Sequence, residues 1–289
     1  MKNRRIYTSN GCYPGMKLKG KNRYKKLYHY TSFDTFVKIW LTKQLKFGII
    51  TNVNDIQEVD ISSSCINFKQ IPLLHAYNDL RTKYKQISFT MDYDSYIKGC
   101  MSPMMWGVYG DKRRGVCIEF DYDKIDFPKE IIKGIIQYKP ILHKHFELDP
   151  HLKNQKDIRS FMYKHRKELM FTKHKSWSGE NEYRILSDRL EYLNIENAIS
   201  TIYLTSNDSL ECILVEKIVK NEVPVKYLHY TQAADNLSIP VLSETKSTRE
   251  QFERIKNSNS YSNKIAEKSM RFYEERKNDE NAVLLMDDI

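Results

Sequence analysis

The order in which helical and strand-like patterns follow one another restricts the fold of this chain more than any other feature. The apolar residues of Phe33–Leu45 recur at helical spacing behind Ser32, which can cap a helix. Apolar and polar residues alternate over residues 116–121, as in a half-buried strand. Helices and strands therefore mix without a regular βαβ rhythm, and the sequence predicts an α+β fold. The other expected strands are Leu27–Tyr30, Phe47–Thr51, Gln86–Met91, Ile131–Tyr138, Glu180–Leu186 and Cys212–Val219, and the other expected helices are Ile71–Tyr84, Pro103–Tyr109 and Ile158–Leu169.

The composition is that of a globular protein rather than a disordered, fibrous or membrane-spanning one. Hydrophobic residues make up 40% of the 289 residues and charged residues 29%, and no apolar run approaches the roughly 18 residues that cross a bilayer. Residues 1–10 lack the apolar stretch of a secretory signal. The five cysteines form no C-x-x-C pair, which argues against structural zinc and disulfides. We expect a cytoplasmic protein with no metal and no membrane partner.

Basic residues are concentrated in two stretches, and the formal net charge is +10. Residues 1–26 hold nine Lys or Arg, no acid and three interleaved tyrosines, a combination that suits phosphates and stacked bases. Residues 129–175 hold twelve Lys or Arg against five acids. Both stretches favour a nucleic-acid partner, and the alternative for the first is a solvated tail that keeps the protein soluble.

Composition divides the chain into three parts. Residues 1–26 form a basic N-terminal arm, residues 27–243 the expected catalytic domain, and residues 244–289 a charged helical C-terminal appendage. The last part has no Gly, Pro, Cys or Trp and is nearly neutral, with nine basic residues and ten acids. Its spaced apolar residues suit an amphipathic helix that docks on a partner, or one that packs on its own domain.

Several common catalytic motifs are absent. The chain has no G-x-G-x-x-G and no G-x-S-x-G, and the P-loop spacing of Gly110 and Gly115 is followed by Val116 and Cys117 in place of Lys and Ser or Thr. Five of the eight histidines lie between residues 143 and 174 but form no H-E-x-x-H, so solvated surface histidines are favoured over a metal site.

Four segments together resemble a bacterial domain family long described only as a domain of unknown function. They are Leu27–Ser32, Thr51–Asp55, Met105–Tyr109 running on to Gly115–Phe120, and Trp177–Arg184. The family looks like a divergent ADP-ribosyltransferase, and it is similar to toxins of anti-phage systems, including those that ADP-ribosylate messenger RNA under control of an antitoxin and a chaperone. The resemblance implies a split, mixed or antiparallel two-sheet ADP-ribosyltransferase-like core with surrounding helices, and NAD as a substrate.

The last of these segments contains the expected catalytic residues. Glu180, Glu182 and Arg184 fall on one face of the predicted strand, a spacing that resembles the Glu-x-Glu motif of ADP-ribosyltransferases. The resemblance makes Glu182 the invariant acid that stabilises the positively charged ribose, and Glu180 a helper that orients the acceptor. Arg184 would keep a carboxylate ionised or contact a phosphate of NAD. The alternative is an exposed strand face with an ordinary ladder of ion pairs.

The first segment supplies expected contacts to NAD. His29 lies at the end of the first strand, where this fold binds the adenine ribose, with Tyr30 beside it and a hydroxyl from Thr31. A strand-end histidine satisfied by the backbone is the simpler interpretation. Ser88–Thr90 would be the second-motif strand of the fold, although it lacks the usual tyrosine.

Aromatic and loop residues complete the expected cofactor site. Trp106 or Tyr109 would stack on the cationic nicotinamide, or would simply fill the core beside neighbouring methionines. Asn54 and Asp55 would shape a loop over the dinucleotide, or form an ordinary Asx turn.

Together these features predict an NAD-dependent ADP-ribosyltransferase that modifies nucleic acid, RNA in preference to DNA, and acts as a toxin in phage defence. An antitoxin or chaperone would bind residues 244–289. Two alternatives stay open, a transferase that modifies protein and an inactive nucleic-acid-binding or interaction module.

Overall fold

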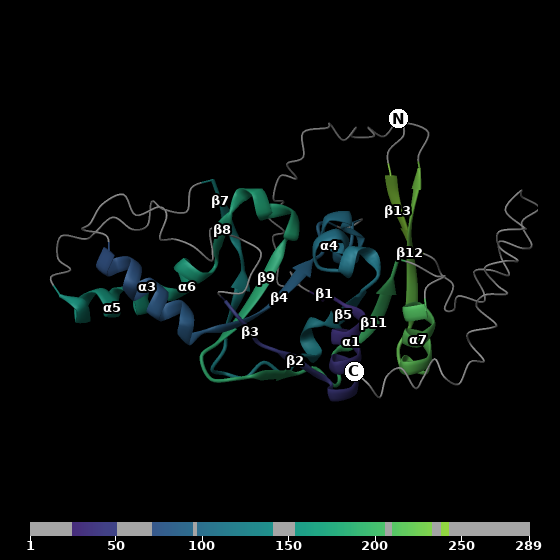
Figure 1. Ribbon diagram of the computed structural model, residues 1–289, viewed down its shortest axis with the longest axis horizontal. Helices are drawn as coiled ribbons and strands as arrows, with labels where there is room; N and C mark the ends of the chain where they lie inside the picture. The colour runs from purple at the N-terminus through teal and green to yellow at the C-terminus, as the bar shows by residue number, and fades with distance from the viewer. Residues whose placement is uncertain are drawn as a thin grey trace, which may run out of the picture.

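The computed structural model describes residues 25–50, 71–94, 97–140, 154–205, 210–232 and 238–242, which fold into a mixed sheet with flanking helices (Figure 1). The predicted α+β class is confirmed. Within the main sheet β11 and β12 run parallel, and the other described neighbours are antiparallel. Across this sheet the order is β13 (Ser238–Leu242), β12 (Val225–Gln232), β11 (Ile199–Leu204), β5 (Val116–Asp121), β1 (Lys26–Thr31), β4 (Lys85–Met91), β9 (Glu182–Ser187) and β6 (Ile132–Ile135), with β3 (Gly48–Ile49) paired to β4.

The main sheet has a narrow junction between β1 and β4. These two strands pair only through Leu27 with Met91 and Tyr28 with Thr90, whereas β1 pairs with β5, and β4 with β9, along their lengths. The expected division into two sheets is thus corrected: the halves are hydrogen-bonded to each other, and they separate beyond the junction. Two further sheets are two-stranded, β10 (Tyr192–Asn194) with β2 (Gln44–Lys46) and β7 (Gln137–Lys139) with β8 (Thr172–His174).

Helices cover the sheet on both faces because successive strand residues point to opposite sides. On one face Leu27 packs in a core with α1 (Phe33–Thr42) and α7 (Leu210–Val219). On the other, Tyr28 and Tyr30 pack with Trp106 of α4 (Pro103–Val108). The β1 strand is therefore packed from both sides, and it pairs with the end of β4 only through its first residues.

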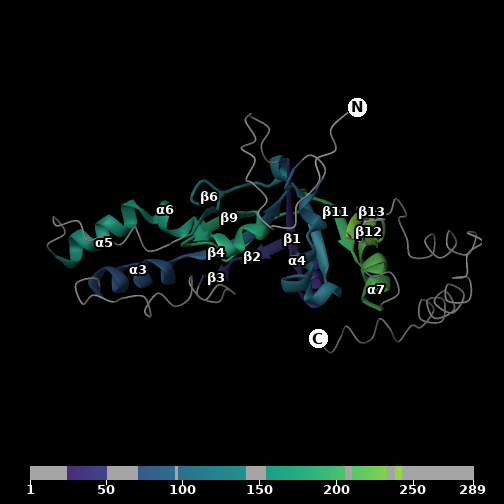
Figure 2. The ribbon, with the colours of Figure 1, turned by 90° about the horizontal axis from the view of Figure 1, so that it is seen from above.

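A helical arm extends from one end of the sheet, opposite to β12 and β13, in both views (Figures 1 and 2). It consists of α3 (Ile71–Lys83), α5 (Gln155–Lys164) and α6 (Arg166–Met170). These helices share a core with Leu186 of β9 and Phe171, which directly precedes β8. The arm is thus packed against the strands that hold the predicted catalytic residues.

Some predicted elements differ from the structure at their ends. The first helix begins at Phe33, where Thr35 N donates to Ser32 Oγ, but it ends at Thr42, because Lys43 adopts a left-handed conformation with φ 53°. The predicted end at Leu45 is therefore wrong. Of the strand expected at Phe47–Thr51, Gly48–Ile49 forms, Phe47 and Ile50 are not in a strand, and Thr51 lies outside the described residues. His165 separates α5 from α6 within the helix expected at Ile158–Leu169.

Two predicted strands were assigned incorrectly. Cys212–Val219 lies within helix α7, since a short run of buried apolar residues suits either element and here covers a sheet face. The strand predicted from Glu180 begins at Glu182, because Glu180 ends a 3₁₀ helix (Lys175–Glu180) and Asn181 is left-handed, φ 46°. The strand β5 is buried on both faces rather than half-buried, because Val116, Ile118 and Phe120 pack in the core with α1 and α7, and Cys117 packs in the core with α4.

The close approach of Gly115 to β1 leads to a stability prediction. A Cβ on Gly115 would lie 2.1 Å from the carbonyl oxygen of Thr31, so Gly115→Ala must push the end of β1 away. We expect a loss of roughly 1–3 kcal/mol in the free energy of unfolding, the usual cost of overpacking. Gly107 of α4 is the matched control, because a Cβ there meets nothing within 4 Å and alanine favours the helix. Chemical denaturation of both variants tests this, and equal stabilities would contradict it.

Candidate active site

Four ionisable side chains of opposite charge are buried together at the start of β9. Glu180, Glu182, Arg184 and Lys173 are each no more than 4% exposed. This charge cluster contains two carboxylates and two cations, so its formal charge is zero. The expectation of an exposed strand face with an ordinary ladder of ion pairs is therefore wrong, because the ion pairs are removed from solvent.

Glu182 accepts the larger number of hydrogen bonds in the charge cluster. Arg184 donates from Nε to Oε1 at 2.7 Å and from Nη2 to Oε2 at 3.0 Å, and Ser88 Oγ donates to Oε1 at 2.6 Å. Lys173 Nζ lies 3.8 Å from Oε2. Burial alone would raise the pKa of the Glu182 carboxyl, but Arg184, Lys173 and Ser88 outweigh burial and hold this pKa below its usual value. Glu182 therefore stays ionised.

Glu180 has fewer partners and the opposite pKa shift. Lys173 Nζ donates to its Oε2 at 2.6 Å, and the hydroxyl of half-buried Tyr109 donates to Oε1. Burial raises the pKa of Glu180, and the charge of Glu182 adds to this rise, against the effect of Lys173. Two adjacent carboxyls with opposite pKa shifts are the usual arrangement of a general acid or base beside a permanent anion.

Strand register and a tight turn bring these side chains together. Ser88 and Thr90 of β4 lie opposite Arg184 and Glu182 of β9, so the four side chains share one face of the sheet. The left-handed Asn181, whose amide donates to the carbonyls of Met91 and Asp92, ends the 3₁₀ helix and returns Glu180 to the same region. The predicted meeting of Glu180, Glu182 and Arg184 thus occurs, although only the last two lie in the strand.

His29 lies where β1 and β4 separate. Its Nδ1 is 3.1 Å from the carbonyl oxygen of Ser88, and its ring meets Phe89 edge-on at 5.9 Å. Burial lowers the pKa of His29, so the imidazole is neutral at neutral pH. Ser88 thus connects the two regions, with its carbonyl bound to His29 and its hydroxyl bound to Glu182.

The other residues expected to contact NAD differ in how far they are buried and in what they contact. The hydroxyl of Tyr30 donates to the Gly99 carbonyl at 2.6 Å, and its ring packs edge-on against Trp106 at 5.1 Å. Trp106 is fully buried and donates from Nε1 to the Cys100 carbonyl at 2.8 Å, so it fills the core in this conformation. Thr31 is 7% exposed at the end of β1. Among the predicted aromatics, Tyr109 is the one in contact with the charge cluster. Asn54 and Asp55 lie outside the described residues.

Sequence reasoning missed three side chains of the site. Lys173 counted only as part of a basic stretch, yet it bridges both carboxylates and its Nζ lies 4.8 Å from the centre of the Trp177 ring. Ser88 was expected to lie on the second-motif strand but not to bind Glu182. The hydroxyl of Tyr138 accepts from Glu182 N at 3.0 Å. Ser88 is placed by the pairing of β4 with β9, and Tyr138 and Lys173 lie opposite each other in the pairing of β7 with β8. The strands β7 and β8 have three residues each, too few for a clear sequence signal.

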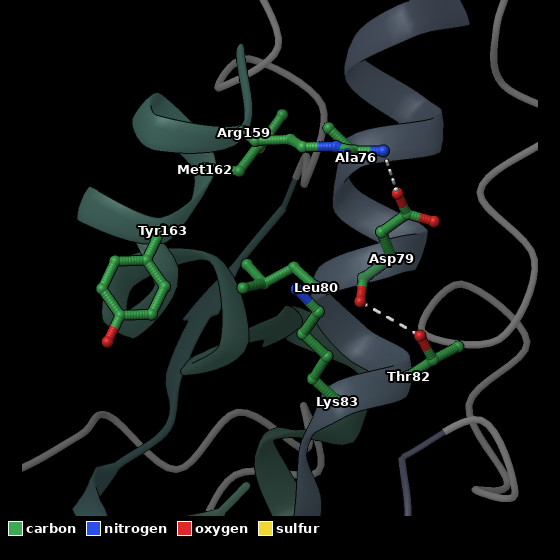
Figure 3. Close-up of a pocket in the computed structure, with 8 residues that line it drawn as sticks. All are labelled: Ala76, Asp79, Leu80, Thr82, Lys83, Arg159, Met162 and Tyr163. Carbon is green, nitrogen blue, oxygen red and sulfur yellow. Dashed lines mark hydrogen bonds and ion pairs between the residues drawn. The ribbon is translucent and has the colours of Figure 1, made fainter. Parts of the chain in front are cut away.

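An open groove lies apart from the charge cluster, between α3 and α5 (Figure 3). None of the predicted site residues lines it. Among the described residues, no group of three or more His, Cys, Asp or Glu side chains could hold a metal ion. None of the helices in these ranges is long and apolar enough to cross a membrane.

Residues 105–185 match the model of a family described as a protein of unknown function, DUF2971. The matched stretch runs from α4 into β9 and includes Glu180, Glu182 and Arg184. A match to a family of unknown function agrees with the expected resemblance. No curated protein and no solved structure matches the chain.

The bridging position of Lys173 leads to a second prediction. Lys173→Met leaves two buried carboxylates with one cation, so we expect a loss of about 3–5 kcal/mol in the free energy of unfolding at neutral pH. Adding Glu180→Gln removes the excess charge and should restore part of this loss. Denaturation of both single variants and the double variant measures the coupling.

The same variant should depend on pH in a defined direction. Without Lys173 the pKa of Glu180, already raised by burial, rises further, so the folded protein binds a proton more readily than the unfolded chain. The deficit of Lys173→Met should shrink as the pH falls through this raised pKa and grow as the pH rises. A deficit independent of pH and of Glu180→Gln would contradict the bridging role.

Proposed function

We propose that this protein is an NAD-dependent ADP-ribosyltransferase that modifies nucleic acid, RNA in preference to DNA, and that it acts as a toxin in phage defence. The observation that carries the proposal is the pair of buried carboxyls that share Lys173, with Glu182 also held by Arg184 and Glu180 bonded to the half-buried Tyr109. In agreement with these partners, the pKa of Glu182 is lowered, chiefly by Arg184 against the effect of burial, and burial raises the pKa of Glu180. This pair suits a reaction that needs both a fixed negative charge and a group that accepts a proton.

Glu182 would supply the fixed charge. In glycosyl transfer from NAD, the bond from ribose C1 to the nicotinamide nitrogen breaks and its electron pair leaves with nicotinamide, so positive charge develops on the ribose. A carboxylate kept ionised by Arg184 and Ser88 opposes that charge without having to reorganise. Thr90 adds a buried hydroxyl that has no hydrogen-bond partner and lies opposite Glu182 in the strand register, where it can bind a ribose hydroxyl.

Glu180 would act on the acceptor. As a nucleophilic oxygen or nitrogen bonds to ribose C1, it releases a proton, and a carboxylate with a raised pKa is a better base than an ordinary one. Lys173 holds Glu180 beside Glu182. Because Glu182 is only 3% exposed, the substrate requires Tyr109, which bonds to Glu180, to swing aside.

The fold supports the position of the cofactor. The main sheet is joined at β1 and β4 by two residue pairs only, and the strands diverge beyond them, which suits a split ADP-ribosyltransferase-like core. His29 lies at this divergence and contacts the strand that carries Ser88. By strand alternation, His29 lies on the sheet face of Phe89, opposite to the face of Glu182. A ribose beside Glu182 would therefore reach His29 only through the gap where β1 and β4 separate, and Tyr30, Thr31, Trp106, Tyr109, Arg184 and Asn54 are the further proposed contacts.

Charge supports the nucleic-acid acceptor. Residues 1–24 of the basic arm lie outside the described residues, whereas Lys26, the last residue of the predicted arm, begins β1. The appendage at 244–289, proposed to bind an antitoxin or chaperone, also lies outside the described residues. Part of the second basic stretch, residues 129–175, forms α5 and α6. Incubation with labelled NAD and a mixture of cellular RNA, DNA and protein identifies the acceptor, and label on protein alone would favour a protein-modifying transferase.

One observation favours the inactive-module alternative. The four charges neutralise one another and are covered, as they would be in a cluster that only stabilises the fold. Release of nicotinamide from NAD distinguishes the two functions, because an inactive module binds nucleic acid and releases none.

Glu182→Gln is the direct test of the transferase. The amide keeps the shape of the side chain and loses the charge, so transfer and nicotinamide release should fall by about 10²–10³-fold. Glu196→Gln is the matched control, because Glu196 is exposed and distant in sequence from the site. Melting curves of both variants verify folding. Retention of more than about a tenth of the activity in folded Glu182→Gln would refute the assignment.

The pH dependence of the rate tests Glu180. Only ionised Glu180 can accept a proton, so kcat/KM should rise with pH through the pKa of this group, which burial raises above its ordinary 4.5. Glu180→Gln should lower the rate and remove this rise. The pH profile of nicotinamide release with acceptor present measures the effect, and an unaltered profile in the variant would assign the proton to another group.

A further inference from the structure

The helical arm contains a groove that is lined by none of the residues of the charge cluster. It has a volume of about 330 Å³ between α3 and α5 (Figure 3). Its buried floor is apolar, formed by Ala76, Leu80 and Met162, each less than 7% exposed. This volume lies at the lower end of the roughly 300–1,000 Å³ that is typical of small-ligand sites. The groove therefore suits a single planar group rather than the surface of a folded protein.

An aromatic ring and cations form the rim of this groove. Tyr163 lines the groove with 54% of its surface exposed, and the Cζ of Arg166 lies 4.0 Å from the centre of its ring. Arg166 also donates from Nη1 to the backbone carbonyl of Tyr163 at 2.7 Å, which holds the guanidinium beside this residue. Tyrosine stacked with arginine is a platform on which a nucleic-acid base can lie.

The cations around the groove are available to phosphates. Lys83 and Arg159 line it, and Arg159 is held only by an exposed ion pair to Asp79 at 3.4 Å, which is weak in water. Seven Lys or Arg face three acids in the sequences of α3, α5 and α6. This excess matches a polyanion, and the aromatic rim beside an apolar floor favours one with exposed bases over an acidic peptide.

We propose that the groove between α3 and α5 binds a nucleotide of single-stranded nucleic acid, its base stacked on Tyr163 and its phosphates held by Lys83 and Arg159. The arm is tied to the charge cluster, because Arg184 Nη1 donates to the Met170 carbonyl at the end of α6 at 2.9 Å. The role of the bound strand as the acceptor rests on the proposed function, whereas its binding in the groove does not.

Binding of a short, fluorescently labelled single-stranded RNA to the full chain, without NAD, tests this site by anisotropy. Raised salt weakens the contribution of other cations and leaves stacking. Tyr163→Ala should reduce the affinity roughly 10-fold, whereas Tyr163→Phe, which keeps the ring, should bind as the wild type does. Tyr192→Ala is the matched control, because Tyr192 is 50% exposed on β10 and does not line the groove, so its loss should change nothing.

Three comparisons complete the test. Arg159→Ala should make the affinity less dependent on salt. Single-stranded DNA of the same sequence should compete with RNA at the groove, and a duplex, whose base faces are covered, should compete poorly. The proposal is overturned if Tyr163→Ala binds RNA as the wild type does, or if polyglutamate competes as well as RNA does.

The binding assay and the transfer assay can refute the groove proposal and the transferase proposal independently of each other. Loss of RNA affinity in Tyr163→Ala, in a protein that releases no nicotinamide, supports the groove and refutes the transferase. Transfer to RNA by a protein whose affinity is unchanged by Tyr163→Ala supports the transferase and refutes the groove.

Discussion

The site depends on the pairing of buried charges around Glu182. A carboxylate removed from water is costly unless cations and hydrogen bonds compensate it, and here Arg184, Lys173 and Ser88 do so. The compensation is unequal, because Glu182 receives most of the donors and Glu180 shares Lys173 with it. This inequality separates the pKa values of two adjacent carboxyls, which is the property that the proposed chemistry requires.

The pairing of β1 with β4 positions the residues of the proposed cofactor site relative to the charge cluster. Since β1 is bonded to β4 by two residue pairs only, the remainder of β1 turns away and leaves His29 at the divergence. Ser88 contacts both regions, because its carbonyl oxygen is bonded to His29 and its hydroxyl donates to Glu182. Gly115 allows the start of β5 to pass close to Thr31, so the end of β1 has little freedom to move. The geometry around NAD would thus be set by backbone packing rather than by mobile side chains.

The sequence predicted what depends on local pattern. The capped start of α1, the strands β1 and β4 and the meeting of Glu182 with Arg184 follow from periodicity and from strand alternation. The prediction from sequence was wrong where tertiary packing determines the secondary structure, as for Cys212–Val219, whose apolar run fits a helix or a strand equally well. Lys173 could not be found in this way, because a lysine among basic neighbours gives no sign that it lies in a short strand, β8, and is buried beside two glutamates.

A second carboxylate cluster clarifies what distinguishes the site. Glu119 is also buried, and it accepts hydrogen bonds from the hydroxyls of Tyr203 and Ser200. It also forms an ion pair with Lys26, whose Nζ lies 2.9 Å from Oε1 of Glu119. The Lys26 side chain is 32% exposed, so this cation stays partly hydrated and the pair costs less to bury. In the cluster of Glu182 each charged side chain is at most 5% exposed. Buried ion pairs often stabilise a fold no more than apolar side chains of similar volume do, so the four desolvated charges agree with the proposed reaction, which requires a dehydrated carboxylate.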